Sequence, residues 1–316
     1  MVNLDQFEIL RNPPNERWLE LIEATNKDEG WMMGPEDYES WVRGIGQNNF
    51  SFYCAIDKAS NKLAGTVILA IFPSVHRSPR LATVGMFYTR PEFRSTGIGS
   101  YLFKILMEGE ENNNVGLNGV LAMTAKYSQR HGFSHYSPWK LSIYTARCTE
   151  LNPANLSPVS PIKIVNRDTL NWNDYFNFDV KILGGVRRDQ YIKNYLNQKG
   201  AHNRFAVHPD GTIQGVCNIR EVVAKGLVLG PFYADSNEVA AALLKATVDS
   251  IPNIAEFGTM LLVAPNTNAE SAELFNKLAE GKVEHCGYMM SQFTKEVVAV
   301  PDQMVYSLTD YANNFV

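Results

Sequence analysis

The chain has 316 residues, of which 45% are hydrophobic, 20% are charged and 11% are aromatic, and its formal net charge is −4. This composition is typical of a water-soluble globular protein of about two domains, and it excludes the disordered, collagen-like and membrane-spanning classes. The weakly acidic balance provides no electrostatic footprint for nucleic acid or for an anionic membrane surface.

The first half of the chain shows alternating strand and helix patterns. Taken in order, they predict a strand at 7–10, helices at 15–27 and 35–42, strands at 50–56, 63–72 and 81–89, a helix at 100–108, a strand at 119–124, a helix at 125–131 and a strand at 133–144. The turn segment DKASNK joins 50–56 to 63–72 as a hairpin.

The segment TELNPANLSPVSP, at 149–161, has three prolines and many small polar residues, which is the composition of a linker. It predicts a first domain over 1–148 and a second over 162–316. In the second domain a similar order follows: a hairpin of 205–208 and 213–219, a strand at 226–233, a helix at 239–248, a strand at 260–263, a helix at 270–278 and a strand at 289–300. The repeated order indicates duplication of one plan.

One segment, Arg94-Ser95-Thr96-Gly97-Ile98-Gly99, lies between a predicted strand and a predicted amphipathic helix. Glycines permit a tight turn and let main-chain N–H groups approach a ligand closely. The following helix directs its unpaired N–H groups and its positive dipole end to the same point, which predicts a phosphate or diphosphate site. The dinucleotide fingerprint GxGxxG is incomplete, because Leu102 stands at its third glycine, and GxxxxGK[ST] is absent.

This segment resembles the acetyl-CoA loop of the GCN5-related N-acetyltransferases (GNAT), whose pattern Q/R-x-x-G-x-G/A is matched by Arg94, Gly97 and Gly99. A second element of that family, a short helix followed by a Gly-Phe that opens the last strand, is matched at Gly132-Phe133. The resemblance implies an α/β (α+β) fold of two tandem GNAT-like domains. Each domain is expected to hold a mixed, mostly antiparallel central sheet flanked by helices.

The resemblance also implies that acetyl-CoA (coenzyme A) is the co-substrate. The strand before the loop is expected to leave its neighbour and to pair with the pantetheine arm through Phe87, Tyr88 and Thr89. A main-chain N–H near Phe87 or Tyr88 is expected to polarise the thioester carbonyl. The diphosphate is expected on main-chain amides of the loop, at Arg94, Ser95, Thr96, Gly97, Ile98 and Gly99.

The implied reaction is direct attack by the amine of a small molecule on the acetyl thioester in a ternary complex, which needs a base and an acid. The family often places a tyrosine four residues before the glycine of Gly-Phe. That position is Ser128 here, with Tyr127 beside it, and either hydroxyl is a candidate catalytic acid or a packing group. His131 is expected on the exposed side of its helix.

Two short segments between the first two predicted helices are candidates for the acceptor side. Trp31, Met32 and Met33 are expected either to line the acceptor pocket or to form a helix-packing cluster. Asp28 and Glu29 can attract a cationic amine or can form a solvated helix end.

The second half resembles the C-terminal GNAT-like domain of holothin-type (YitH-like) acetyltransferases, through Gly184-Gly185 and Gly230-Pro231-Phe232-Tyr233-Ala234 among other features. It departs from the active pattern, because Asp235-Ser236-Asn237-Glu238-Val239 stands where the loop belongs. Its carboxylates repel a diphosphate, so only the N-terminal half is expected to bind the cofactor. The residues expected either to face a cleft between the halves or to form ion pairs are Asp179, Arg187, Arg188 and Arg220.

Two functions of different classes remain open, because the loop supports both: an acetyl-CoA-dependent N-acetyltransferase, and a non-catalytic acyl-CoA-binding sensor or interaction module. Transfer of a long acyl chain ranks last. No metal, nucleic acid or membrane partner is expected, and the oligomeric state is not indicated. No secretory signal is expected from the residues at the N-terminus. The widely spaced cysteines predict buried free thiols in a reducing cytoplasm: Cys54, Cys148, Cys217 and Cys286.

Overall fold

The computed structural model describes residues 3–73, 80–156 and 162–313. Its first half contains β1 (Phe7–Arg11), α1 (Asn15–Glu29), α2 (Asp37–Ile45), β2 (Phe50–Asp57), β3 (Lys62–Phe72), β4 (Leu81–Thr89), α3 (Ile98–Met107), β5 (Asn114–Val120), α4 (Thr124–His131) and β6 (His135–Arg147). Its second half contains β7 (Ile164–Val165), α5 (Trp172–Ile182), α6 (Asp189–Leu196), β8 (Ala201–Val207), β9 (Ile213–Val222), β10 (Gly226–Ala234), α7 (Asn237–Val248), β11 (Thr259–Pro265), α8 (Ala269–Leu278), β12 (Glu284–Phe293) and β13 (Val305–Ser307).

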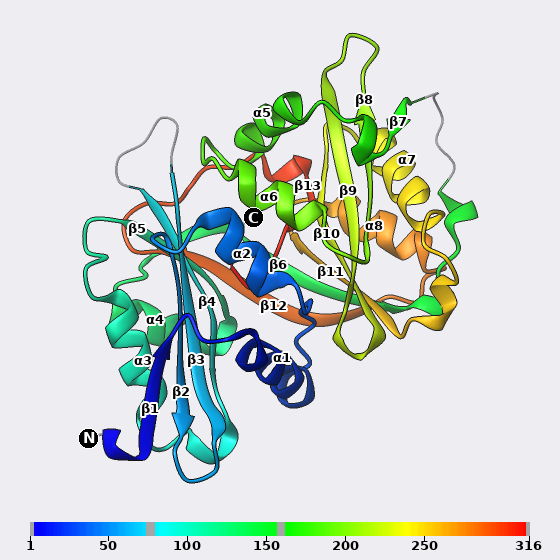
Figure 1. Cartoon of the computed structure of the whole chain (residues 1–316). Helices are drawn as coiled ribbons and strands as arrows, with labels where there is room; N and C mark the ends of the chain where they lie inside the picture. The colour runs from blue at the N-terminus through cyan, green and yellow to red at the C-terminus, as the bar shows by residue number, and fades with distance from the viewer. Residues whose placement is uncertain (1–2, 74–79, 157–161, 314–316) are drawn as a thin grey trace.

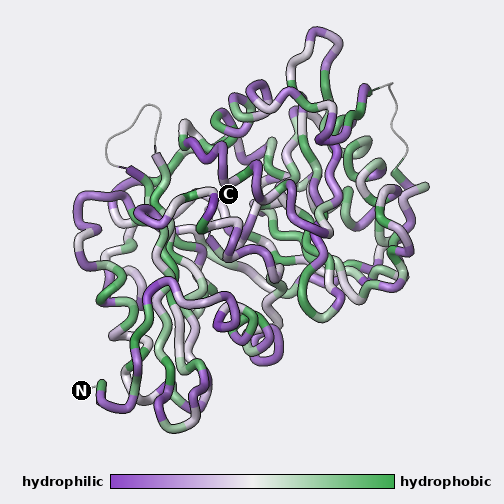
Figure 2. Tube along the Cα trace, viewed as in Figure 1, coloured by the Kyte–Doolittle hydropathy of each residue, from purple (hydrophilic) through white to green (hydrophobic). Residues whose placement is uncertain are grey.

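The mixed α/β class is confirmed, and a single sheet of mostly antiparallel strands carries helices on both faces (Figure 1). Its order is β1-β2-β3-β4-β5-β12-β6-β11-β10-β9-β8-β7, with β13 beside β10. Only β4–β5 and β10–β11 are parallel among the described pairs. The hydrophilic turn that joins β2 to β3 lies at the lower end of these two strands in the view of Figure 2.

The two halves exchange strands at the centre of the sheet. β12, from the second half, lies between β5 and β6 and pairs with both in an antiparallel register. β6, from the first half, pairs in turn with β11 of the second half. Each half therefore completes its part of the sheet with a strand of the other, so that the hydrogen-bonded ladder runs without a break across the molecule.

Several predicted elements differ from the structure. The strand expected at 119–124 is wrong, because β5 begins at Asn114 and helix α4 begins at Thr124. The asparagines at the start of β5 make this strand difficult to recognise in the sequence. Asn114 is nevertheless buried, and its Nδ2 donates a hydrogen bond to the main-chain oxygen of Glu296 at 2.8 Å. The strand expected at 289–300 is also misplaced, since β12 ends at Phe293. Four elements were not predicted: α5, α6, β7 and β13.

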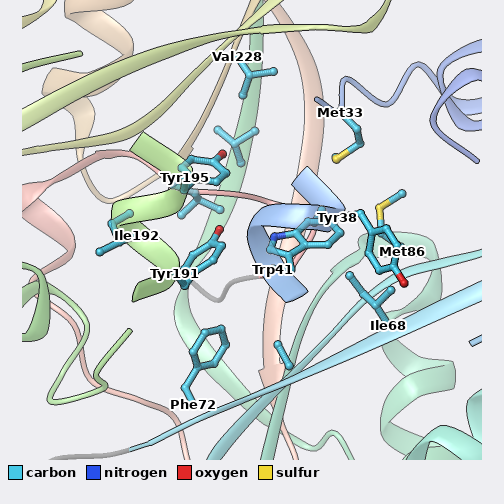
Figure 3. Close-up of a cluster of buried hydrophobic side chains, with 14 of the residues drawn as sticks. Met33, Tyr38, Trp41, Ile68, Phe72, Met86, Tyr191, Ile192, Tyr195 and Val228 are labelled. Atoms are coloured by element: carbon cyan, nitrogen blue, oxygen red, sulfur yellow. The ribbon is translucent and has the colours of Figure 1, made fainter. Parts of the chain in front are cut away.

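The largest hydrophobic cluster lies between the halves, where α1, α2, α5 and α6 cover one face of the sheet. Figure 3 shows Trp41 of α2 beside Tyr191 of α6, with Phe72 of β3 below them. All three side chains are almost completely buried, and burial of a large apolar side chain contributes roughly 1.5–3 kcal/mol. Two smaller clusters lie on the other face, one under α3 and α4 and one under α7 and α8.

The C-terminal segment 308–313 crosses this central cluster from the second half to the first. The Tyr195 hydroxyl donates to the main-chain oxygen of Thr309 at 2.6 Å, and Trp41 Nε1 donates to Asp310 at 2.9 Å. At the end of the segment, Thr83 Oγ1 of β4 donates to the main-chain oxygen of Asn313 at 2.7 Å. The segment therefore ties both halves together from inside.

No helix in the described ranges is long and apolar enough to cross a membrane. Over the same ranges, no three histidine, cysteine or acidic side chains gather in a way that could hold a metal ion. All four cysteines are free thiols, and Cys54, Cys148 and Cys217 are buried as expected. Cys286 is exposed, because it lies at an irregularity in the pairing of β12 with β6.

Candidate functional site

Strand β4 parts from β5 halfway along its length. The parallel pairing covers only Leu81–Val84 against Asn114–Leu117, whereas β4 stays paired with β3 up to Thr89. A bulge follows, because Thr66 opposes Tyr88 while Ile68 opposes Gly85. The extra residue, Met86, has φ +45°, and its main-chain oxygen accepts a hydrogen bond from Thr66 Oγ1 at 2.8 Å. An opening therefore begins between β4 and β5 at this bulge.

The glycine-bearing loop follows directly at the end of β4. Gly97 has φ +84° and immediately precedes α3, where the N–H of Ile98 donates to Thr96 Oγ1 at 3.3 Å. A left-handed residue at this position favours glycine, since it costs other residues about 1–2 kcal/mol. Thr96 Oγ1 donates to the Phe93 main-chain oxygen at 2.7 Å, and Ser95 is exposed. Ile98 is buried in the cluster under α3, so only its main chain can face a ligand.

Arg94 and Gly99 have contacts that the sequence did not indicate. The Arg94 guanidinium forms an ion pair with Glu29 of α1, at 2.5 Å between Nη2 and Oε1, and its Nε donates to the Thr89 main-chain oxygen at 3.1 Å. At Gly99, a Cβ atom would lie 2.5 Å from Thr89 Oγ1. The lack of a side chain at Gly99 therefore lets α3 pack close to β4. At Gly97 the lack of a side chain instead permits the left-handed backbone of the turn.

A cavity of about 120 Å³ lies between β4, α3 and α4. Its lining combines apolar and cationic side chains: Phe87, Ser100, Met123, Lys126, Tyr127, Arg130 and His131. The two cations on α4 suit an anion, and the loop lies at the start of the neighbouring helix α3. A larger, open hollow of about 420 Å³ occurs at the ends of β6 and β11, but it shares no residue with the loop.

Tyr127 and Ser128 differ in their surroundings. The Tyr127 ring packs among Phe87, Phe103 and Phe133, and burial raises the pKa of its hydroxyl to about 12. Ser128 is half-buried and is not among the residues that line the cavity. The catalytic role of either hydroxyl stays a prediction.

His131 is not on the exposed side of α4, contrary to expectation. Its ring stacks on Phe103, with centroids 4.1 Å apart, because the last turn of α4 packs on α3. Burial, together with the nearby charges of Arg130 and Lys126, lowers the pKa of His131. The ring therefore favours its neutral form next to the cavity.

On the opposite face of β4, another group of predicted residues meets. Consecutive side chains of a strand point to opposite faces, so Tyr88 lies in the central cluster while Phe87 lines the cavity. The Tyr88 hydroxyl donates to Asp28 at the end of α1, and the Tyr88 ring packs edge-on against Trp31, with centroids 6.3 Å apart. Met32 and Met33 are buried in the same cluster.

The corresponding opening of the second half is filled by the chain itself. Pairing of β10 with β11 covers Leu227–Leu229, after which β13 lies against β10, with Phe232 opposite Ser307. Ser307 Oγ donates to the Leu229 main-chain oxygen at 2.6 Å, and the Leu308 N–H donates to Val263 of β11 at 2.9 Å. In place of a glycine loop, the Ser236 side chain accepts from Val239 N at the start of α7.

The charged residues that the sequence singled out in the second half form interior ion pairs, except Arg187, which pairs with Asp189 near the surface. Arg188 holds Asp179 through two hydrogen bonds of 2.8 Å, and both side chains are at most 2% exposed. Arg220 pairs with Asp37 of α2, a partner that the sequence did not reveal. The Arg220–Asp37 pair joins the two halves, whereas the Arg188–Asp179 pair lies within the second half. Both pairs are buried in the interior.

Comparison with known proteins identifies the family. Residues 15–130 match the model of the "Acetyltransferase (GNAT) family", and residues 177–306 match that of the "Acetyltransferase (GNAT) domain". A putative acetyltransferase from Pyrococcus horikoshii is similar in structure, with a TM-score of 0.69 and 15% identity, over 99% of this chain and 98% of that one. A tandem GNAT protein from the clavulanic acid biosynthesis pathway gives a TM-score of 0.61 and 15% identity, over 91% and 98%.

An uncharacterised protein of Caenorhabditis elegans is 23% identical over 259 residues, which are 76% of this chain and 75% of that protein. At such identities the structural likenesses establish the fold, a GNAT fold that supports an acyl-CoA-dependent acetyltransferase in general. The two family matches fall one in each half and together cover most of the sequence. The chain is therefore a tandem member of the GNAT acetyltransferase superfamily.

Proposed function

We propose that this protein is an acetyl-CoA-dependent N-acetyltransferase that acts on the amine of a small molecule, with its reaction centre in the N-terminal half. One observation carries the proposal: β4 parts from β5 at Val84, and the helix start at Gly97 lies at the end of the same strand. An extended arm fits such an opening as an added strand. The diphosphate fits the main-chain amides at the start of α3.

The residues present fit acetyl-CoA as substrate. The main chain of Phe87, Tyr88 and Thr89 borders the opening, and the cavity beside it carries Lys126 and Arg130. The Arg94 side chain is engaged with Glu29, and the main-chain N–H groups of Arg94 and Thr96 donate to main-chain oxygens within the loop. We therefore assign the diphosphate to the amides of Ser95, Gly97 and Gly99. The high pKa of Tyr127 keeps its hydroxyl protonated at neutral pH, as a donor to the thiolate sulfur must be.

A single molecule of coenzyme A per chain follows from the same geometry. β13 occupies the second opening through main-chain and side-chain hydrogen bonds, and the loop there is replaced by a serine-capped helix start. Calorimetric titration with coenzyme A is expected to give a stoichiometry of one. A value of two would contradict the assignment of the N-terminal half alone. Because all four cysteines are free, we place the enzyme in a reducing compartment, the cytoplasm.

The decisive assay mixes the protein with acetyl-CoA and a panel of small amines and measures free thiol. Direct attack in a ternary complex predicts intersecting lines in initial-rate plots against both substrates. Binding of acetyl-CoA without thiol release for any amine would favour the sensor. Replacing Ser128 with alanine and Tyr127 with phenylalanine together is expected to slow turnover and to leave the affinity for coenzyme A unchanged. An unchanged rate would remove both hydroxyls from the reaction.

Gly97→Glu tests the cofactor loop and is expected to abolish coenzyme A binding. Gly109→Glu is its matched control, because Gly109 also has a left-handed backbone, with φ +90°, and no atom lies within 4 Å of the position of its Cβ. Both variants therefore suffer a similar backbone strain, and only the first places a carboxylate at the loop. Equal affinity in the two variants would contradict the proposed diphosphate site.

A further inference from the structure

The hydrogen bond between Tyr88 and Asp28 lies next to the part of β4 that no longer pairs with β5. Tyr88 follows the bulge of β4, so its main chain borders the opening where the thioester is proposed to lie, while its side chain leaves on the face opposite the cavity of Phe87. An amine that approaches an acyl group held in the opening from that opposite face therefore meets the Tyr88 hydroxyl.

The two partners differ in exposure. Tyr88 is 4% exposed, and its hydroxyl hydrogen bonds Asp28 Oδ2. Asp28 is exposed at the last turn of α1, and a carboxylate has two oxygens with room for several donors. The pair therefore reaches from the interior of the sheet to solvent, with its carboxylate end accessible.

The neighbours of the pair favour a cation. Trp31 lies edge-on against the Tyr88 ring and is partly buried, so an aromatic surface borders the hydroxyl. Glu29 adds a second carboxylate, which is held by Arg94 of the cofactor loop. An ammonium group is stabilised by a nearby carboxylate and by an aromatic ring.

We propose that Asp28 and Tyr88 form the proton-accepting pair for the acceptor amine, and that this amine arrives as an ammonium ion. The inference rests on the proposed N-acetyltransferase function and assigns the base, which the sequence did not identify. It also makes the acceptor class a basic alkylamine, for which loss of a proton must precede attack.

The proton transfer balances through the existing hydrogen bond. The ammonium group gives one proton to the Tyr88 oxygen as the Tyr88 hydroxyl gives its own proton to Asp28, which leaves a neutral amine, an intact phenol and a carboxylic acid. The amine nitrogen then bonds to the acetyl carbon while the carbon–sulfur bond breaks. The thiolate takes up the second proton that the nitrogen loses, and Asp28 releases the first to solvent.

The alternative role of the pair is structural, since the same hydrogen bond docks the end of α1 on β4. Asp28→Asn and Tyr88→Phe keep the shape of each side chain and remove the proton path. Glu23→Gln is the matched control, because Glu23 is an exposed carboxylate on the same helix and its change of charge is identical. Tm and coenzyme A affinity are measured for all variants to monitor the fold and the cofactor site.

The discriminating readout is the rate as a function of pH with one accepted alkylamine. Loss of a general base typically lowers the rate by about 10²–10⁴-fold, and we expect at least a hundredfold loss in kcat/KM at pH 7 for both variants. The deficit is expected to shrink by up to about tenfold per pH unit as the pH approaches the pKa of the amine, because the variants then receive a neutral nucleophile. Calorimetry is expected to show weaker binding of the alkylammonium ion to the coenzyme A complex of Asp28→Asn.

Each outcome decides the question. A deficit that stays constant with pH indicates a structural role and overturns the proposal, as does full activity in Asp28→Asn. Full activity in Tyr88→Phe alone overturns the relay through the hydroxyl. If the wild-type protein releases no thiol with any amine while it still binds coenzyme A, the proposed function fails. That result is distinct from a failure of the pair, which requires an active wild type.

Discussion

Substitution of Gly99 by alanine tests why the second glycine of the loop is needed. The new Cβ would lie 2.5 Å from Thr89 Oγ1, while the next atoms, of the Phe87 ring, stand at an ordinary 3.6 Å. The obstacle is therefore one hydroxyl on a β-branched side chain, whose rotation is restricted. Overpacking of this kind costs about 1–3 kcal/mol, so we expect Gly99→Ala to lower the free energy of unfolding by that amount and Tm by a few degrees.

A second substitution makes the test specific. Thr89→Ala removes the hydroxyl, so the double variant Thr89→Ala/Gly99→Ala is expected to be more stable than Gly99→Ala alone. Urea unfolding measures both differences. Because the added methyl group points toward β4, the double variant is expected to bind coenzyme A within about threefold of the wild-type affinity in calorimetry. No recovery of stability in the double variant, or an unperturbed Gly99→Ala, would refute the packing explanation.

Three further predictions concern the interior and the cavity. Gly85→Ala would place a Cβ 1.5 Å from the Ala312 main-chain oxygen, so we expect it to displace the C-terminal segment and to cost about 3 kcal/mol or more in urea unfolding; wild-type stability would exclude this packing. Arg188→Met leaves the buried Asp179 without its cation and is expected to lower the free energy of unfolding in urea by about 3–5 kcal/mol. Arg43→Met, at the exposed ion pair of Arg43 with Glu39 on α2, is expected to lower it by less than about 1 kcal/mol, and equal losses would contradict this. Since the pKa of His131 is lowered in the folded state, the unfolded chain binds more protons. Stability should therefore fall as pH drops below about 6.5, and His131→Gln should weaken that dependence; equal pH profiles would contradict it.

The local elements of the cofactor site could be predicted from sequence because their causes are local. Strand alternation up to Thr89, the two glycines and the apolar face of α3 lie within about twenty residues of each other, so periodicity and glycine chemistry suffice. The same reasoning failed at β5. Its polar asparagines look unlike a central strand, and the side chain of Asn114 finds its partners in the distant main chain of Lys295 and Glu296, 181 and 182 residues away.

The acceptor side shows why contacts between distant residues were missed. Asp28 and Tyr88 are 60 residues apart in sequence, and the sequence alone left Asp28 as one of two acidic residues at a helix end. Arg220 likewise finds Asp37 across 183 residues and across the two halves. Such pairs depend on how the sheet brings helices together, and no local pattern encodes that register.

The amino-acid sequence by itself determined the loop that starts α3, the duplicated order of elements and the absence of that loop from the second half, because each depends on neighbouring residues. Only the tertiary structure decided that the halves exchange β6 and β12, that β13 closes the second opening, and that Tyr88 meets Asp28 beside the first. The physical reason is that strands pair through main-chain hydrogen bonds, which every sequence can form. Which strands become neighbours is therefore decided by the burial of side chains over the whole sheet.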